Sequence, residues 1–199
     1  MRKIFLLLFT FASVKCYSQQ NTATTDVGVV INGVRWATRN VDAPGTFAAT
    51  PESLGMHFQW NRRQGWSATG EVAGWDSSVP TGTTWERAND PCPPGWRVPT
   101  SGELRRLRDA GSVRETRDGV NGHLFGTAPN LLFLPLAGNR SMNGTLFHVG
   151  SVGFYWSSAP STSAASTTIN AMYLFLREGN NSERAAHRAV GFSVRCVAE

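Results

Sequence analysis

The chain has 199 residues, of which 41% are hydrophobic and 17% charged, and its formal net charge is +5. This length fits one domain with a buried core, and a modest charge without a basic stripe argues against nucleic-acid binding. The abundance of Gly, Ser, Thr and Asn favours short strands and long ordered loops over a helical bundle.

The first residues predict an export signal. Arg2 and Lys3 precede an apolar run from Ile4 to Ala12, which is too short to span a bilayer as a helix. Small residues at Cys16 and Ser18 favour cleavage after Ser18, and the alternative is a lipid anchor at Cys16. We therefore expect a signal peptide over 1–18, a short linker over 19–26 and one domain over 27–199. The protein is then exported, to the cell surface, the outer membrane or the medium, with no membrane span.

The mature chain opens with a hairpin signal. Val29–Ile31 and Val34–Trp36 flank Asn32-Gly33, a favoured two-residue hairpin turn. A further strand is predicted over 55–60. The segment 61–84 lacks a helical period and is predicted to be a long loop packed by Trp66 and Trp75, although these rings are also able to stack on a ligand.

One helix is predicted after the proline-rich segment 91–99. Thr100 and Glu103 form the pattern of a capping box, and Gly111 ends the helix. Leu104 and Leu107 face the core, whereas the cluster Arg105, Arg106 and Arg108 is interpreted as a solvated helix face.

The second half of the chain predicts closing strands. These span 131–136, 153–158, 171–177 and 192–197. The Ser/Thr/Ala-rich tract 159–168 lies between two of them and is predicted to be a loop within the domain.

Two cysteines, Cys92 and Cys196, remain beyond the export signal. An exported compartment permits disulfides, so pairing is the simple interpretation, and a reactive thiol is the alternative. Neither cysteine has a histidine near it in the sequence.

Several segments together resemble the Fibrobacter succinogenes major paralogous domain. They are INGVRWATRNV (31–41), DPCPPGWRVPT (90–100), LFLPLAG (132–138), GFYWSS (153–158) and GFSVRCV (191–197). The resemblance implies an exported domain of Bacteroidetes-type bacteria with an α+β, C-type-lectin-like fold: twisted antiparallel strands, one or two helices and long loops. It also implies a Cys92–Cys196 bridge.

Some proteins of this kind are variable proteins of diversity-generating retroelements. In them, adenine-directed mutagenesis varies positions just before the C-terminal Ser-Val-Arg motif. The segment 159–190 is similar to such a variable region, because its Ala, Ser, Thr, Asn, His, Tyr and Phe residues are reachable from an asparagine codon. Surface loops of any origin are also rich in Ser, Thr and Asn.

No catalytic, metal or cofactor site is predicted. The chain has no Walker-type glycine loop and no His-Glu-x-x-His motif, and His57, His123, His148 and His187 lie without ligand spacing. Formylglycine-generating enzymes share the implied fold, but their reactive cysteine pattern is not visible here. The triplet Ala128-Pro129-Asn130 lacks the carboxylate or amide that calcium-dependent lectins place before the proline.

The candidate ligand surface is built on the strand predicted over 171–177. Side chains alternate along a strand, so Met172, Leu174 and Leu176 are expected in the core, and Tyr173, Phe175 and Arg177 on the exposed face. A strand buried on both faces is the alternative. Adjacent segments complete the predicted set with His187, Ser161, Thr162, Ser163, Thr168, Ala185, Ala186 and Val190.

The leading functional hypothesis is a binding module that presents this face to a protein or glycan partner. A structural or tip subunit of a surface fibre, and an enzyme of the formylglycine-generating-enzyme-like fold, are the alternatives. A free strand edge favours the fibre subunit, and a convergent set of titratable groups favours the enzyme.

Overall fold

The computed structural model describes residues 26–199. The signal peptide predicted over 1–18, the alternative lipid anchor at Cys16 and most of the linker predicted over 19–26 therefore lie outside the described residues. Within the described part, no helix has the length and apolarity that a membrane span requires.

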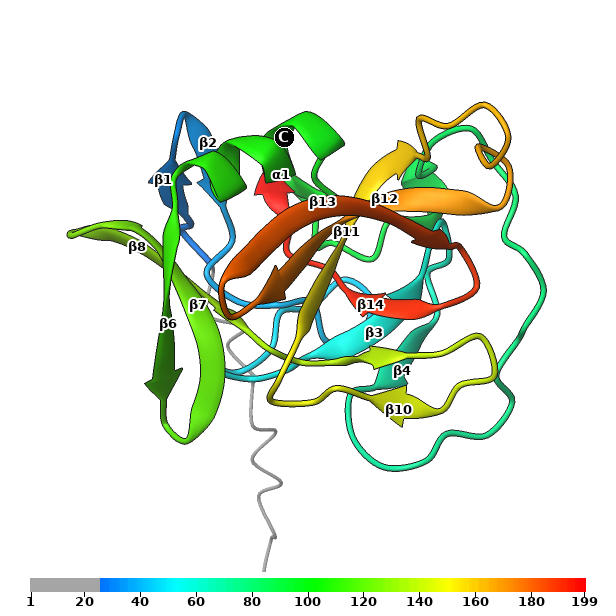
Figure 1. Cartoon of the computed structure of the whole chain (residues 1–199), viewed down its shortest axis with the longest axis horizontal. Helices are drawn as coiled ribbons and strands as arrows, with labels where there is room; N and C mark the ends of the chain where they lie inside the picture. The colour runs from blue at the N-terminus through cyan, green and yellow to red at the C-terminus, as the bar shows by residue number, and fades with distance from the viewer. Residues whose placement is uncertain (1–25) are drawn as a thin grey trace, which may run out of the picture.

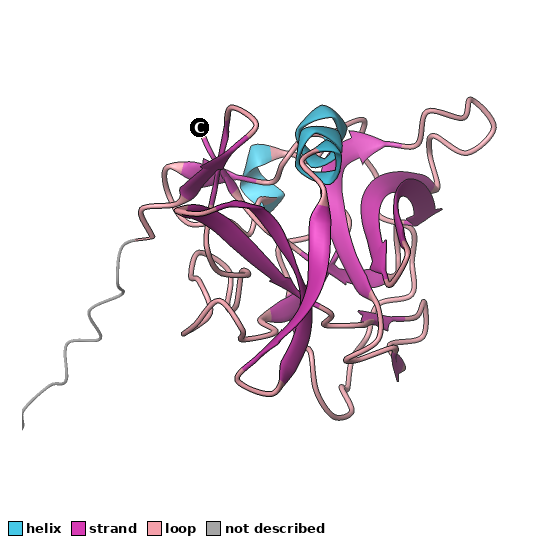
Figure 2. Cartoon of the chain, turned by 60° about the vertical axis from the view of Figure 1, so that its left-hand side comes forward, coloured by secondary structure: helices cyan, strands magenta, loops and turns pink. Residues whose placement is uncertain are grey.

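The protein consists mostly of β-strands and loops (Figures 1 and 2). The described residues form one α-helix, α1 (Ser101–Asp109), and one short 3-10 helix, η1 (Arg87–Asn89). The strands are β1 (Val29–Ile31), β2 (Val34–Trp36), β3 (Met56–Gln59), β4 (Gly65–Ser67), β5 (Trp96–Arg97), β6 (Ser112–Arg117), β7 (Val120–Thr127), β8 (Asn130–Pro135), β9 (Asn139–Arg140), β10 (Leu146–Phe147), β11 (Gly153–Pro160), β12 (Asn170–Arg177), β13 (Asn180–His187), β14 (Gly191–Ser193) and β15 (Val197–Ala198).

These strands form three sheets. The order in the first is β1-β2-β15-β5, so the beginning and the end of the described chain meet in one sheet. The largest sheet runs β10-β9-β14-β11-β12-β13, with β3 and β4 attached through β14, and the third is β6-β7-β8. All pairings between these strands are antiparallel except the parallel β11–β14 pair.

The two most local predictions are confirmed. Asn32 and Gly33 have φ values of 46° and 77°, as a two-residue turn matched to the twist of the hairpin requires. At α1, the Glu103 N–H donates to Thr100 Oγ1 (3.2 Å) and the Thr100 N–H donates to Glu103 Oε2 (2.7 Å), which completes the capping box. Leu104 and Leu107 are buried on the side of α1 that faces the core.

The core occupies both faces of the layer made by β11 and β12. Leu174 and Leu176 pack with Leu104 and Leu107 of α1 on one face. On the other face, Tyr173 and Phe175 belong to an aromatic cluster with Phe154, Trp156 and Phe192. The sequence-based expectation that Tyr173 and Phe175 are exposed is therefore wrong, because their exposed fractions are only 7% and 8%. Met172 is half-buried rather than fully in the core.

Other strand assignments from the sequence are incomplete. The hairpin β6–β7 and the whole of β13 are not anticipated, and β4 lies inside the segment predicted to be a loop. The strand predicted over 192–197 is divided into β14 and β15. In the segment between these two strands, the Val194 carbonyl accepts from the Val41 N–H, and the Cys196 carbonyl accepts from the Ala37 N–H. Trp66 and Trp75 pack on each other with ring centroids 5.0 Å apart, as the packing interpretation predicts.

The predicted disulfide is present. Cys92 and Cys196 are bonded, with Cα atoms 6.1 Å apart and a separation of 104 positions in sequence. The bond ties the segment before β5 to the segment between β14 and β15, and both cysteines are buried.

Buried arginines organise the loops. The Arg140 guanidinium donates to the carbonyls of Ser67, Thr69, Gly70 and Gly144 at 2.7–3.2 Å. Because a guanidinium offers five donors in a fixed plane, one side chain satisfies carbonyls from two loops. This arginine therefore holds the segment after β4 against the β9–β10 connection.

Candidate functional site

The sequence-predicted ligand residues lie on the β12–β13 hairpin, on loop 161–169 and on the turn 187–190 (Figure 1). The structure brings these segments together, since the Arg188 N–H donates to the Ile169 carbonyl (2.9 Å). Arg188 is buried, and its guanidinium also donates to the Thr167 carbonyl and to the Gly82 carbonyl (2.8 Å). The turn, loop 161–169 and the segment 80–82 are thus joined by one side chain.

The strand register divides the predicted residues between two faces. Met172 is opposite Ala185, and Asn170 is opposite His187. Directly paired residues share a face, so Ala185 and His187 lie on the side of the sheet that α1 partly covers. Ala186 is opposite Ala171 and lies on the other side, with Tyr173 and Phe175.

The loop residues differ in exposure. Thr162, Ser163 and Thr168 are exposed. Ser161 is 4% exposed, its N–H donates to the Asn170 carbonyl (2.9 Å), and its hydroxyl lies 3.0 Å from that of Ser166. Ser161 therefore closes the loop, and the prediction that it lies on a ligand surface is not supported by its burial. Val190 is half-buried against the aromatic cluster.

An arginine that sequence reasoning missed covers this cluster. The Arg184 guanidinium lies 3.7 Å from the centroid of the Phe175 ring, and Arg184 Nε donates to the Ser182 hydroxyl (3.0 Å). Arg184 is opposite Tyr173 on the next strand. Burial raises the pKa of the Tyr173 hydroxyl, and the nearby Arg184 opposes that shift. The Arg184 guanidinium thus stacks on the Phe175 ring at the surface of the hairpin.

Arg177 and Arg184 have no ion pair among the residues that the structure describes. The two carboxylates nearest in sequence are already engaged: Glu178 pairs with Arg114 (2.8 Å), and Glu183 pairs with Arg105 (2.9 Å). Both Arg177 and Arg184 are exposed. They are therefore available to acceptor groups from outside the chain.

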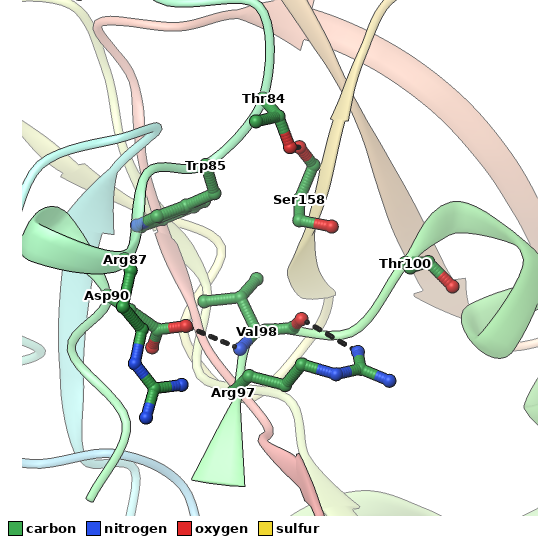
Figure 3. Close-up of a pocket in the computed structure, with 8 residues that line it drawn as sticks. All are labelled: Thr84, Trp85, Arg87, Asp90, Arg97, Val98, Thr100 and Ser158. Atoms are coloured by element: carbon green, nitrogen blue, oxygen red, sulfur yellow. Dashed lines mark hydrogen bonds between the residues drawn. The ribbon is translucent and has the colours of Figure 1, made fainter. Parts of the chain in front are cut away.

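A pocket of about 240 Å³ with a mixed apolar and polar lining is bordered by β11, the strand next to β12 (Figure 3). It is formed where η1, β5, the start of α1 and the end of β11 meet. Its lining residues are Thr84, Trp85, Arg87, Asp90, Arg97, Val98, Thr100 and Ser158. None of them belongs to the ligand set predicted from the sequence, although most lie in segments 90–100 and 153–158 that carry the family resemblance.

The charged side chains that line the pocket already make hydrogen bonds or ion pairs with neighbouring residues. Asp90 accepts hydrogen bonds from the N–H groups of Cys92 (2.8 Å) and Val98 (3.1 Å), and burial raises its pKa. Arg97 makes two bonds to Glu103 (2.9 and 2.6 Å), and these raise the pKa of Arg97. Arg87 pairs with Glu199.

The pocket borders β11, the strand that pairs with β12 of the hairpin. The Ser157 hydroxyl, next to Ser158, donates to the Met172 carbonyl (2.9 Å). Met172 is in turn opposite Ala185 on β13.

None of the four histidines lines the pocket. His57 is fully buried, and burial, with the nearby positive charge of Arg140, lowers its pKa to about 3. His123 is buried beside Ser112 (2.9 Å). Among residues 26–199, no group of three or more His, Cys, Asp or Glu side chains is arranged to hold a metal ion.

The chain matches no family model, no curated protein and no solved structure. Its function is therefore inferred from the geometry of the hairpin and the pocket.

Proposed function

We propose that this chain is an exported surface protein with a C-type-lectin-like fold that binds a protein or glycan partner. The proposed partner surface consists of the β12–β13 hairpin with loop 161–169 and the turn 187–190. The motif resemblance supports both the fold and the export. The proposed fold is also supported by the mostly-β structure, the single α-helix in the described part and the Cys92–Cys196 bond.

The observation that carries the proposal is that two arginines of the hairpin, Arg177 and Arg184, have no ion pair among the described residues. Arg184 rests on the ring of Phe175, and Arg177 lies at the end of the same strand face. Arginine and aromatic side chains are enriched at the energetic centres of interfaces, where the flat guanidinium both stacks and donates hydrogen bonds. The buried Phe175 ring holds the Arg184 side chain in place, and this lowers the entropy cost of binding.

The test uses an array of immobilised glycans and a displayed random-peptide library. Wild-type protein is compared with the Arg177→Ser, Arg184→Ser double variant. Ligands selected by the wild type should bind the double variant at least roughly 30-fold more weakly, a hot-spot effect of about 2 kcal/mol. Arg106→Ser, which changes an exposed arginine on α1, should bind as the wild type does. Equal binding by the double variant would contradict the proposal.

Diversification of segment 159–190 is part of the proposal, and burial refines where it acts. We expect variation at exposed positions, namely Thr162, Ser163, Thr168, Arg184 and Ala185. Tyr173, Phe175 and Arg188 should remain nearly constant because they are buried. Sequencing the locus and its neighbourhood provides the test: a reverse transcriptase gene and a near-repeat of this coding segment should be present. Variation that spares the exposed positions would argue against this refinement.

A fibre subunit is the second candidate, and one observation favours it. β13 is an edge strand of the largest sheet, and no described strand pairs with its outer edge. An eight-residue edge is long enough to accept another strand. Light scattering over a wide range of protein concentrations distinguishes the two candidates: a fibre subunit should assemble progressively, whereas a binding module should remain monomeric.

A further inference from the structure

We propose that the pocket between η1, β5, α1 and β11 binds one uncharged sugar residue, without calcium. This site is separate from the arginine surface of the hairpin and does not depend on it. The inference rests on the pocket's mixed lining, its charge balance and its size (Figure 3).

The lining offers both apolar surface and free hydroxyl groups. Trp85 and Val98 supply the apolar part, and the Trp85 indole N–H is already occupied by the Asn89 carbonyl (2.9 Å). The Ser158 hydroxyl has no hydrogen-bond partner within residues 26–199. The Thr84 hydroxyl makes only a long contact of 3.4 Å to the Ser158 carbonyl. Hydroxyl groups both donate and accept, which suits a ligand whose own hydroxyls do the same.

The charges favour a neutral ligand over an anion. Each arginine of the lining is already paired with a carboxylate, Arg97 with Glu103 and Arg87 with Glu199. Asp90 adds a further acidic group to the wall. An anion would therefore meet no uncompensated positive charge and would approach a carboxyl group at close range.

The same carboxyl group is unsuited to calcium. Both Asp90 oxygens accept backbone N–H groups, from Cys92 and Val98. Calcium takes six to eight oxygen ligands, usually with several carboxylates, and Asp90 is the only acidic residue that lines the pocket. Sugar binding here must therefore depend on direct hydrogen bonds and apolar contact.

The size of the pocket fits a single ring. A volume of about 240 Å³ lies just below the range of roughly 300–1,000 Å³ that is usual for pockets of larger small-molecule ligands. This is room for one pyranose, with neighbouring residues of a longer glycan lying outside.

The test is saturation-transfer NMR with the methyl glycosides of glucose, galactose, mannose and N-acetylglucosamine, in the presence of EDTA. At least one glycoside should bind with a millimolar dissociation constant. Ser158→Leu fills the pocket and should weaken that binding at least tenfold. Ser163→Leu, the matched change on the exposed loop, should leave it unchanged. Thr84→Val removes a hydroxyl with little change of shape and serves as the second variant if Ser158→Leu fails to fold.

Several outcomes would overturn the proposal. These are no binding of any of the four glycosides, binding that persists in both pocket variants, binding that requires calcium, and stronger binding of methyl glucuronide than of its neutral counterpart. The Arg177→Ser, Arg184→Ser variant should retain glycoside binding. Its behaviour separates this site from the hairpin surface, because either proposal is able to fail while the other stands.

Discussion

At the scale of single residues, the main feature of this protein is a set of three buried arginines. Arg140, Arg188 and Arg195 are nearly or fully buried, and carbonyl or amide oxygens, rather than carboxylates, accept their hydrogen bonds. Burial lowers the pKa of each, to about 10 for Arg195. Arginine remains charged under these conditions because its intrinsic pKa is so high. No local sequence pattern marks these arginines, since the accepting carbonyls lie far away in the chain and belong to no particular residue type.

The first prediction concerns Arg188. Arg188→Met should destabilise the fold by about 3 kcal/mol or more, because it leaves the carbonyls of Gly82 and Thr167 without a donor and removes the contact with Trp60. Urea denaturation measures the loss. Arg106→Met changes an exposed arginine and should shift stability by no more than about 0.5 kcal/mol. Equal stability of the two variants would show that Arg188 does not hold the loops.

The second prediction concerns His57 and pH. The folded protein keeps His57 neutral down to a pKa of about 3, whereas the unfolded chain takes up a proton near pH 6.5. Between these values only the unfolded state binds the proton, so stability should fall as pH falls, by about 1.4 kcal/mol per pH unit from this group. His57→Gln should reduce the slope of unfolding free energy against pH by that amount, as measured by urea denaturation at several pH values. An unchanged slope in His57→Gln would contradict the assignment.

The third prediction follows from the burial of the aromatic pair. Tyr173→Ala and Phe175→Ala should each cost roughly 3–5 kcal/mol, because each opens a cavity in the cluster around Phe154 and Phe192. Thermal denaturation should show a large fall in melting temperature for both. An almost unchanged melting temperature would return these residues to the exposed face that the sequence pattern suggested.

At the scale of elements, local signals were sufficient where a few neighbouring residues decide the structure. The Asn32-Gly33 turn and the capping box of Thr100 and Glu103 are examples, since each depends on residues at most three positions apart. β13 is the opposite case. Its sequence, NNSERAAH, has neither β-branched residues nor an apolar alternation, and it is held by its pairing with β12 and by Glu183, which bonds to Ser101 and Arg105 of α1. Such long-range contacts leave no local pattern to read.

The fourth prediction tests the start of α1. Thr100→Ala should cost about 1 kcal/mol, because it removes the acceptor for the Glu103 N–H at the N-cap. The matched Thr162→Ala change, on an exposed loop, should cost much less. Chemical denaturation measures both, and equal losses would mean that the cap contributes little.

For the whole molecule, the segments that the sequence analysis grouped lie together, whereas Tyr173 and Phe175, expected on their exposed face, are buried. The sequence correctly places loop 161–169, β12 and the segment 185–190 together, because they are close in the chain. It does not give the register, which sends Ala185 and His187 to one face and Ala186 to the other. The pocket was missed because its residues come from η1, β5, β11 and the loops beside them. Asp90, Arg97 and Thr100 also have structural contacts of their own.

The fifth prediction concerns the disulfide that spans the domain. The Cys92–Cys196 bond closes a loop of 104 residues. Removing such a constraint on the unfolded chain should cost about 5 kcal/mol in the chain-entropy model. The Cys92→Ala, Cys196→Ala variant should show this loss in urea, and wild type in a strong reductant should approach the same stability. Unaltered stability in both would mean that the bond is dispensable.

The sheet that contains both ends of the described chain has a mechanical consequence. Asp26 accepts hydrogen bonds from Thr38, Val197 pairs with Trp36, and the Glu199 N–H donates to the Gly95 carbonyl. A pull applied between residue 26 and Glu199 would therefore be borne by β1, β2, β15 and β5, with the Cys92–Cys196 bond as a covalent stop behind them. The β12–β13 hairpin lies outside this path of force and should keep its shape under tension at the ends. The pocket lies on the path, because Arg97 belongs to β5 and Arg87 pairs with Glu199.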